Sequence, residues 1–332
     1  MASSRTKITE IITGLAMLGF PNIDRALSVR PDWLLNVSDD EYDLLADEWM
    51  AGHFTAEFET AWEHGHRFLA SPDGLRGRVP DRVEWQGPGR PPGYDQIPAD
   101  LRIDQVYLIS CKYGSDILYN ASPSHLFDRL LAERRGDRTD WFVEVAPEAY
   151  QDLYARSVEV SDLSRMPSRV SELDGESRER LKAALPTRGA WPDALVSPYR
   201  DFVNAVSVAT AHRWKANLGD KAVQEEMLWR LLRFQPAPYF VLGASSDGTP
   251  LRFRVDTPSD FRRQFSIRAF DVWADAMGQP LIRWRAELMG ARRPIEGHVE
   301  VRWSRGRFGG VPEAKIHLDT PHHEVANYVP IG

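Results

Sequence analysis

The sequence predicts a mixed α+β fold, with helices through much of the first two thirds and an antiparallel sheet in the last third. Apolar residues recur at helical spacing up to about residue 70 and again across residues 140–235. A dense run of β-branched and aromatic residues occupies 103–113, and alternating apolar and polar positions fill much of the chain after residue 239. Helices followed by consecutive strands are typical of the α+β class.

The length of 332 residues is enough for one large domain or two modest ones. Changes in composition and in hydrophobic pattern divide the chain into three consecutive segments. Residues 1–135 hold a helical N-terminus and a mixed core, residues 136–235 are mostly helical, and residues 236–332 form an antiparallel β segment rich in Arg and Trp.

Two helices are expected in the N-terminal segment. Ser38 and the two acidic residues after it are cap candidates for a helix that continues through Trp49. A second pattern, over residues 54–70, places Phe54, Phe58 and Trp62 on one apolar stripe. In that helix Glu59 and Glu63 lie four residues apart on an adjoining face.

The core segment reads as strand, loop, strand and helix. Residues 83–85 form a short strand candidate, and the Pro/Gly-rich residues 87–93 form a loop. Residues 103–113 are expected to form one continuous, buried central strand. Ser122 and Pro123 then mark the cap and first turn of a helix over residues 123–135.

Later elements follow the same logic. Amphipathic helices are expected at 199–214 and 223–234, and the prolines at 236 and 238 end the second one. Strands are expected at 239–245, 250–257, 265–276, 280–289, 298–304 and 314–319, joined by turns that include Met277-Gly278-Gln279.

Composition indicates an intracellular protein. Cys111 is the only cysteine, which excludes an internal disulfide and suits a reducing compartment. The apolar run at residues 11–20 is too short to span a membrane and lacks the pattern of a signal peptide. We therefore expect a cytoplasmic protein without a membrane partner.

Charge is uneven along the chain. The formal net charge is −7, yet residues 251–307 hold twelve Arg, no Lys, four Asp and three Glu, a local balance of +5. Such a segment is compatible with a phosphate-binding face or with a solvated sheet face.

The most informative segment is residues 109–115, Ile-Ser-Cys-Lys-Tyr-Gly-Ser. Alternation in a strand places Ser110 and Lys112 on one face and Cys111 on the other. A lysine on an apolar strand needs an acidic partner or access to water, because burying an unpaired ammonium is costly. Beside a carboxylate pair that binds Mg²⁺, Lys112 would orient an attacking water and offset charge on a phosphate.

This segment resembles the third core strand of the PD-(D/E)xK nuclease superfamily, the restriction-endonuclease fold, in the variant in which a small residue replaces the acid before x-Lys. The resemblance spans about residues 54–130. It implies a restriction-endonuclease-like mixed core flanked by helices, with Lys112 as the catalytic lysine and Ser110 at the degenerate position. It also implies two acids, one from a helix and one from the preceding strand.

Several acids could fill these positions. Glu59 and Glu63 are the helix candidates. Glu84 is the favoured strand acid, because antiparallel pairing of 82–86 with 104–112 would bring it near Ser110 and Lys112. Asp81 and Asp104 are less favoured candidates for the strand acid. On a continuous strand, Asp104 would be about 26 Å from Lys112. Asp100 is placed worse still.

The resemblance implies a Mg²⁺- or Mn²⁺-dependent endonuclease that hydrolyses DNA, of restriction or defence type. It leaves RNA open as a substrate and is compatible with a homodimer. The Arg- and Trp-bearing C-terminal sheet would then hold the nucleic acid through Arg283, Arg285, Arg302, Trp303, Arg305 and Arg307.

Two other functions are compatible with the sequence. Ser110 in place of an acid favours a non-catalytic nucleic-acid-binding or scaffold protein on the same core. Glu313-Ala314-Lys315 is a second acid-x-Lys pattern, which would move an active site to the C-terminal sheet. His317, His322 and His323 could bind a metal, although histidines near a terminus without a spaced partner are usually surface residues.

Overall fold

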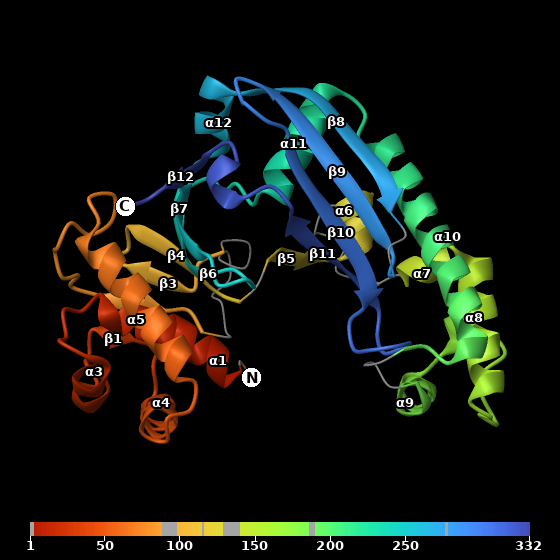
Figure 1. Cartoon of the computed structure of the whole chain (residues 1–332), viewed down its shortest axis with the longest axis horizontal. Helices are drawn as coiled ribbons and strands as arrows, with labels where there is room; N and C mark the ends of the chain where they lie inside the picture. Colours follow the sequence, from red (N-terminus) through yellow and green to blue (C-terminus); the bar gives the residue numbers. More distant parts are fainter. Residues whose placement is uncertain (1–2, 88–97, 115, 129–139, 186–189, 276–277) are drawn as a thin grey trace. The chain divides into compact units, whose positions relative to one another are not determined.

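The computed structural model describes residues 3–87, 98–114, 116–128, 140–185, 190–275 and 278–332, and confirms the α+β class (Figure 1). The chain divides into two compact units. Unit 1 gathers residues 1–116, 232–265 and 321–332, and unit 2 gathers residues 117–231 and 266–320. The units therefore differ from the three consecutive segments expected from the sequence, because the chain leaves unit 1 and returns to it twice.

Unit 1 begins with helices whose ends follow the expected capping rules. Ser38 caps the fourth α-helix in a capping box with Glu41, as the acidic start of that segment predicts. The expected helix at residues 54–70 is confirmed with one residue's difference at its start. The helices of this region are α1 (Ser4–Lys7), the π-helix η1 (Ile8–Ile12), α2 (Thr13–Ala16), α3 (Ile23–Val29), α4 (Asp39–Met50) and α5 (Thr55–Ala70).

The sheet of unit 1 has seven strands in the order β1-β2-β3-β4-β6-β7-β12. Strand β3 pairs antiparallel with both β2 and β4. Strand β6 runs parallel to β4 and antiparallel to β7. The strands are β1 (Leu34–Leu35), β2 (Val83–Trp85), β3 (Leu101–Ile103), β4 (Tyr107–Tyr113), β6 (Tyr239–Ala244), β7 (Pro250–Val255) and β12 (Tyr328–Pro330).

The N-terminal helices cover one face of this sheet (Figure 1). Apolar side chains of η1 and α5 pack there against Ile109 of β4 and Phe240 of β6. Helices α2 and α5 approach closely at Gly65, where an added Cβ would lie 2.3 Å from the Thr13 carbonyl oxygen. A glycine is therefore required at this helix crossing.

The predicted continuous strand at 103–113 is wrong, because the chain turns after Ile103. Asp104 and Gln105 both adopt left-handed φ angles, of 48° and 59°, and the Val106 N–H donates to the Ile103 carbonyl oxygen. This tight turn makes β3 and β4 an antiparallel hairpin, with Leu101 opposite Ile109 and Ile103 opposite Tyr107. Asp tolerates the left-handed region better than most residues, but Gln gives no such signal.

Unit 2 is built on a five-stranded antiparallel sheet in the order β5-β11-β10-β9-β8, which confirms the antiparallel strands expected after residue 265. The first two strands of the expected C-terminal sheet, β6 and β7, instead belong to the mixed sheet of unit 1, where β6 runs parallel to β4. Its strands are β5 (Ile117–Ala121), β8 (Ser266–Asp275), β9 (Leu281–Met289), β10 (Ile295–Trp303) and β11 (Pro312–Leu318). Its helices are α6 (Pro123–Phe127), α7 (Trp141–Val145), α8 (Pro147–Val160), the 3₁₀ helix η2 (Val170–Glu172), α9 (Gly175–Ala184), α10 (Asp193–Asn217) and α11 (Lys221–Leu231).

Helix α10 packs along β8 and β9 in unit 2 (Figure 1). The amphipathic patterns at 199–214 and 223–234 correspond to α10 and α11, and Pro123 opens α6 as expected. Residues 88–93 of the Pro/Gly-rich loop, residues 129–135 of the expected helix and Met277 of the expected turn lie outside the described residues.

The end of the chain completes unit 1 with α12 (Pro258–Gln264), the 3₁₀ helix η3 (His322–Glu324) and β12. Thr257 and Asp260 form a capping box at the start of α12. Within the described ranges, none of the helices combines the length and apolar character needed to cross a bilayer.

Candidate functional site

The candidate site lies where β3 and β4 part, at the end of the hairpin opposite the turn. The backbone ladder ends with the Asp100 N–H donating to the Ile109 carbonyl oxygen, at 2.7 Å. The next N–H of β4, that of Cys111, donates instead to Asp100 Oδ2 at 2.7 Å. A carboxylate therefore replaces the neighbouring strand at this point of β4.

Asp100 also lies beside the hydroxyl of Ser110, whose Oγ is 3.4 Å from Asp100 Oδ2. Ser110 is buried, and alternation along β4 places Lys112 on the same face two residues further on. The structure thus brings one acid, the serine and the lysine to the end of one hairpin. Sequence reasoning ranked Asp100 last, because it treated residues 103–113 as one strand.

A second acid reaches this region from the helical face. Glu10 in η1 accepts a hydrogen bond from the Trp85 indole, with 2.6 Å between Nε1 and Oε2. Burial raises the pKa of the Cys111 thiol well above its usual value, and the negative charges of Asp100 and Glu10 raise it further. Glu10 therefore lies on the helical face with Cys111, opposite the face of Ser110 and Lys112. We call Asp100, Ser110 and Lys112 the β4 centre.

Strand β6 fixes the backbone at Lys112. The parallel register pairs Lys112 with Gly243, where φ is 142°. A Cβ at Gly243 would lie 1.8 Å from the Lys112 carbonyl oxygen, so only glycine allows this approach. The imidazole of His322 lies close enough to Lys112 and Asp116 for their charges to act on its pKa, which burial lowers.

The favoured strand acid, Glu84, is placed differently from the prediction. Strand β2 pairs with β3 and not with β4, so Glu84 lies opposite Arg102. Its carboxylate is buried and forms an ion pair with Arg102, 2.6 Å from Nη2. One strand separates it from β4, because the turn at Asp104 inserts β3 between the two.

The remaining predicted acids also lie away from Ser110. Asp104 sits at the turn, the opposite end of the hairpin, and pairs with Arg78 at 2.7 Å. Asp81 is exposed before β2 begins. Glu59 and Glu63 are exposed on α5, and Glu63 pairs with Arg67 one turn later, at 2.7 Å.

The buried acid of α5 is Glu57, on a different face from the predicted pair. It forms an ion pair with Arg5 at 3.2 Å and a hydrogen bond with the Tyr113 hydroxyl at the end of β4. The sequence contains a signal for this burial. Glu57 directly precedes Phe58 of the apolar stripe, and both residues lie on the buried side of α5.

Three of the predicted nucleic-acid-binding residues share the open face of the unit 2 sheet, but acids accompany each of them. Arg283 pairs with Asp275 at 2.5 Å and with Asp319 at 3.2 Å. Arg285 lies 3.2 Å from Glu287 and 3.7 Å from Glu296. Arg302 lies 3.8 Å from Glu300 and 3.9 Å from Glu313. Lys315, which belongs to the second acid-x-Lys pattern, pairs with Glu313 at 3.2 Å.

Trp303 and Arg307 do not belong to that open face. The Trp303 indole donates to the Tyr150 hydroxyl at 3.2 Å and stacks on Phe202. Arg307 is buried, with its guanidinium 4.1 Å from the centre of the Trp191 ring. Arg305 is exposed and follows β10. Arg and Trp alternate in sequence, but alternation sends them to opposite faces of the sheet.

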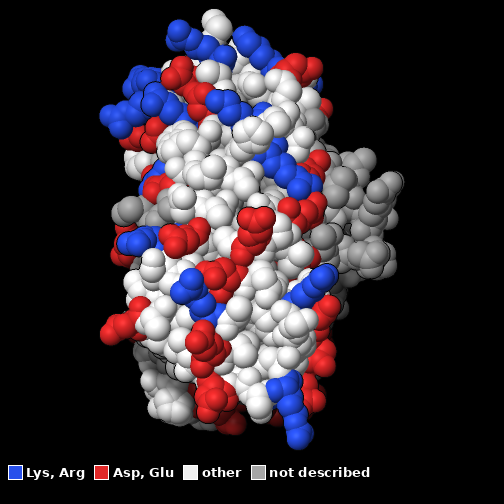
Figure 2. Space-filling model, turned by 90° about the vertical axis from the view of Figure 1, so that its right-hand side faces the viewer, with Lys and Arg blue, Asp and Glu red and all other residues white. Residues whose placement is uncertain are grey.

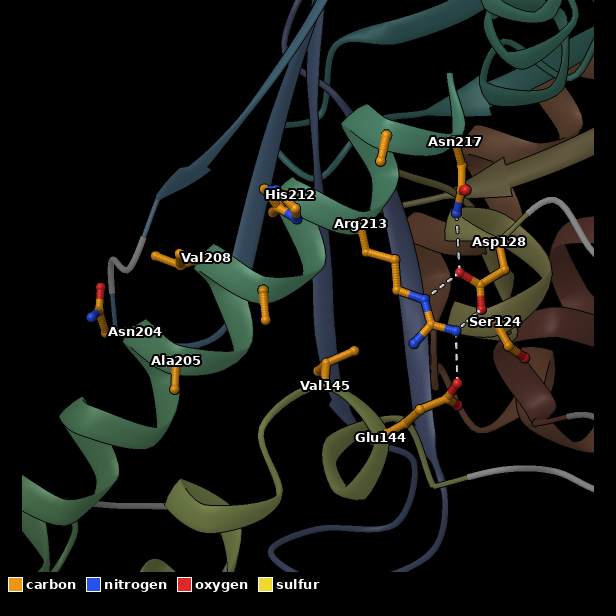
Figure 3. A pocket seen from close by; sticks show the side chains of 12 residues that line it. Ser124, Asp128, Glu144, Val145, Asn204, Ala205, Val208, His212, Arg213 and Asn217 are labelled. Carbon is orange, nitrogen blue, oxygen red and sulfur yellow. Dashed lines mark hydrogen bonds and ion pairs between the residues drawn. The ribbon is translucent and has the colours of Figure 1, made fainter. Parts of the chain in front are cut away.

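A pocket of about 1020 Å³ lies along α10 in unit 2 (Figure 3). Arg213 at its wall binds Asp128 through two hydrogen bonds of 2.6 Å and Glu144 through one of 2.7 Å. Two carboxylates thus satisfy the guanidinium, and the lining offers no unbalanced positive charge to a phosphate. The contacts tie α10 to the segments around α6 and α7.

Charged side chains are interspersed on the face over α8 and α10, which Figure 2 shows. Acidic groups stand among the basic ones, so no continuous basic field covers this face. Long-range attraction of a polyanion needs such a field, and this face does not supply it.

A different cluster could hold a metal ion in unit 2. His298, Glu300 and His317, on β10 and β11, offer ligand atoms that all lie within 4.8 Å of one another. The adjacent His317 lowers the pKa of Glu300, against the effect of burial, and the charge of Arg302 lowers it further. Comparison with known proteins gave no matching family model, curated protein or solved structure.

Proposed function

We propose that this chain is a metal-dependent phosphodiesterase that cleaves DNA at the β4 centre. The observation that carries the proposal is the end of the hairpin, where Asp100 lies against Ser110 and Cys111 and shares the face of Lys112. An acid on one strand and a lysine on the next, two residues beyond a small polar residue, suits the hydrolysis of a phosphodiester.

The donor chemistry at the β4 centre fits a hard divalent cation. Mg²⁺ commonly binds through one or two carboxylates and completes its shell with water and substrate phosphate oxygens. Asp100 is the carboxylate that lies on the face of Ser110 and Lys112. It would hold Mg²⁺ or Mn²⁺, which when bound would supply a polarised phosphoryl oxygen and an acidic water.

The other residues have roles that follow from their positions. The ammonium of Lys112 would offset negative charge on the phosphate and orient the attacking water. Ser110 replaces the acid that the resemblance leads one to expect, and its hydroxyl lies beside the carboxylate of Asp100. The centre therefore carries fewer negative charges than a three-acid site, which weakens its hold on the cation.

DNA is proposed as the substrate on the strength of the resemblance, with RNA as the alternative. A restriction or defence role, activity as a homodimer and a cytoplasmic location belong to the same proposal. The acids beside Arg283, Arg285 and Arg302 shift the expected DNA contacts away from the open face of the unit 2 sheet.

The test is cleavage of plasmid and oligonucleotide substrates with Mg²⁺ or Mn²⁺, comparing the wild type with Lys112→Ala and Lys315→Ala. We expect metal-dependent cleavage that Lys112→Ala abolishes and Lys315→Ala retains. Loss of cleavage in Lys315→Ala alone would contradict the β4 centre and move the site to β11.

A non-catalytic nucleic-acid-binding protein is the second candidate, favoured by the hydroxyl of Ser110 at an acid position. Titration calorimetry with Mg²⁺ separates the two functions. The phosphodiesterase predicts a Mg²⁺ site that Asp100→Asn weakens, whereas the binding protein predicts DNA binding without Mg²⁺ binding or cleavage.

A further inference from the structure

Two histidines face each other across β10 and β11 in unit 2, whereas the β4 centre belongs to unit 1. His298 and His317 are direct partners in the antiparallel register. Their rings stack at 4.6 Å with only 5° between the planes. The register and the stacking therefore place two imidazole ligand candidates side by side on one face of the sheet.

The third donor comes from the same two strands. Glu300 lies two residues after His298 on the same face of β10, and its Oε2 is 3.6 Å from His317 Nε2. That distance is longer than a normal hydrogen bond, and the Nε2 atom of His317 is buried without a hydrogen-bond partner among the described residues. Both atoms thus retain coordinating capacity.

An outer carboxylate orients one of the rings. Asp319 Oδ1 lies 2.7 Å from Nδ1 of His298, which assigns the proton to Nδ1 and leaves Nε2 as an acceptor. A carboxylate behind a histidine is the usual support of a metal-bound imidazole, because it fixes the tautomer and the ring orientation.

The neighbouring cations are paired with acids other than Glu300, although Lys315 is its direct partner in the register. Lys315 is held by Glu313 at 3.2 Å, and Arg283 by Asp275 and Asp319. Arg302 approaches Glu300 only to 3.8 Å and divides its charge between that residue and Glu313. Each basic side chain on this part of the face therefore has an acid other than Glu300.

We propose that His298, Glu300 and His317 form a binding site for a divalent transition-metal ion such as Zn²⁺. Two imidazoles and one carboxylate are a donor set that Zn²⁺ prefers, whereas Mg²⁺ prefers oxygen ligands alone. The ligand atoms lie within 4.8 Å of one another and must close to about 3.4 Å, the separation set by Zn–N bonds of about 2.1 Å in a tetrahedral site.

The antiparallel register fixes the backbone of β10 and β11, so the closure would come from rotation of the three side chains. Three protein ligands leave at least one coordination position for water or for an anionic ligand. The site lies on unit 2 and shares no residue with the β4 centre, so it does not depend on the proposed nuclease activity.

The experiment is calorimetric titration of the full chain with Zn²⁺, together with Co²⁺ titration followed by visible absorption. We expect one equivalent to bind, and we expect His317→Ala or Glu300→Gln to weaken binding by about a hundredfold or more. His323→Ala is the matched control, because this exposed histidine lies outside the cluster and its loss should leave affinity unchanged.

Asp319→Asn provides a milder variant, for which we expect a loss of about tenfold or more because the ring of His298 loses its orienting partner. This variant decides the question if His317→Ala does not fold. Failure of the wild type to bind Zn²⁺ or Co²⁺, or equal binding by wild type, His317→Ala and Asp319→Asn, would overturn the proposal. Asp100→Asn should bind Zn²⁺ like the wild type.

Discussion

At the scale of single residues, the β4 centre shows what one sequence can and cannot predict. Ser110 and Lys112 were assigned to one face of a strand, and the strand exists. The acid beside them is Asp100, whereas Glu84 is neutralised by Arg102 and Asp104 by Arg78. The face on which a strand residue lies can be predicted from local alternation. Its cross-strand partner cannot, because that partner depends on a turn that gives almost no local signal.

The single thiol reports on the charges around the β4 centre. Burial raises the pKa of Cys111, and Asp100 and Glu10 raise it further, so very little thiolate forms at neutral pH. We expect iodoacetamide at pH 8 to alkylate the folded protein at least about tenfold more slowly than the urea-unfolded chain. Mass spectrometry follows the reaction without ambiguity, because the sequence has one cysteine. Equal rates in both states would contradict the half-buried, acid-flanked thiol.

His64 predicts a pH dependence of stability. Burial in α5 lowers its pKa from 6.5 to about 4, with a smaller contribution from Arg252. Between these values the unfolded chain binds more protons than the folded one, so stability is complete above pH 6.5 and is lost as pH falls toward 4. The expected contribution is up to about 3 kcal/mol.

Urea unfolding at pH 7 and pH 5 measures this contribution. His64→Gln should reduce the difference in unfolding free energy between the two pH values. The matched variant His53→Gln, at an exposed histidine paired with Glu48, should leave that difference unchanged. An undiminished difference in His64→Gln would assign the pH dependence to other groups.

At the scale of elements, prediction succeeded where the signal is local. The capping box at Ser38, the apolar stripe of α5 and the alternation in β8 to β11 each lie within one segment. The hairpin of β3 and β4 was missed because Asp104 and Gln105 adopt left-handed φ angles without a glycine. The parallel pairing of β4 with β6 joins strands more than a hundred residues apart, which no local pattern indicates.

Gly243 is the element-scale test of that parallel pairing. Gly243→Ala would place a methyl group 1.8 Å from the Lys112 carbonyl oxygen at a φ of 142°, so β6 must move away from β4. We expect a loss of about 3 kcal/mol or more in the free energy of unfolding. Gly175→Ala is the control, because a Cβ there meets nothing within 4 Å. Similar stabilities for the two variants, measured by urea unfolding, would contradict the register.

At the scale of the whole molecule, charge in the sequence and charge on the surface differ. The balance of +5 over residues 251–307 suggested a phosphate-binding face, yet acids from β8, β9, β10 and β11 and from Asp319 accompany its open-face arginines. Asp275, Glu287, Glu296 and Glu300 were already counted in that balance, and only Glu313 and Asp319 lie beyond the segment. The count contains no information on the antiparallel register, which places these acids beside the arginines.

The affinity for DNA tests whether the neighbouring acids neutralise the open-face arginines. Because Arg285 stands between Glu287 and Glu296, we expect Arg285→Ala to change DNA affinity by less than about twofold and to leave the salt dependence unaltered. Fluorescence anisotropy with a labelled duplex at several salt concentrations measures both quantities. A weaker complex with a reduced salt slope would instead place phosphate on the open face of the unit 2 sheet.

The most direct test of the central claim compares two acids at opposite ends of one hairpin. Plasmid cleavage with Mg²⁺ or Mn²⁺ would be measured for the wild type, Asp100→Asn and Asp104→Asn, after circular dichroism has shown that all three are folded. We predict that Asp100→Asn lowers the cleavage rate by about a hundredfold or more, while Asp104→Asn stays near the wild-type rate. Undiminished cleavage by Asp100→Asn, or no cleavage by the wild type with either metal, would contradict the claim.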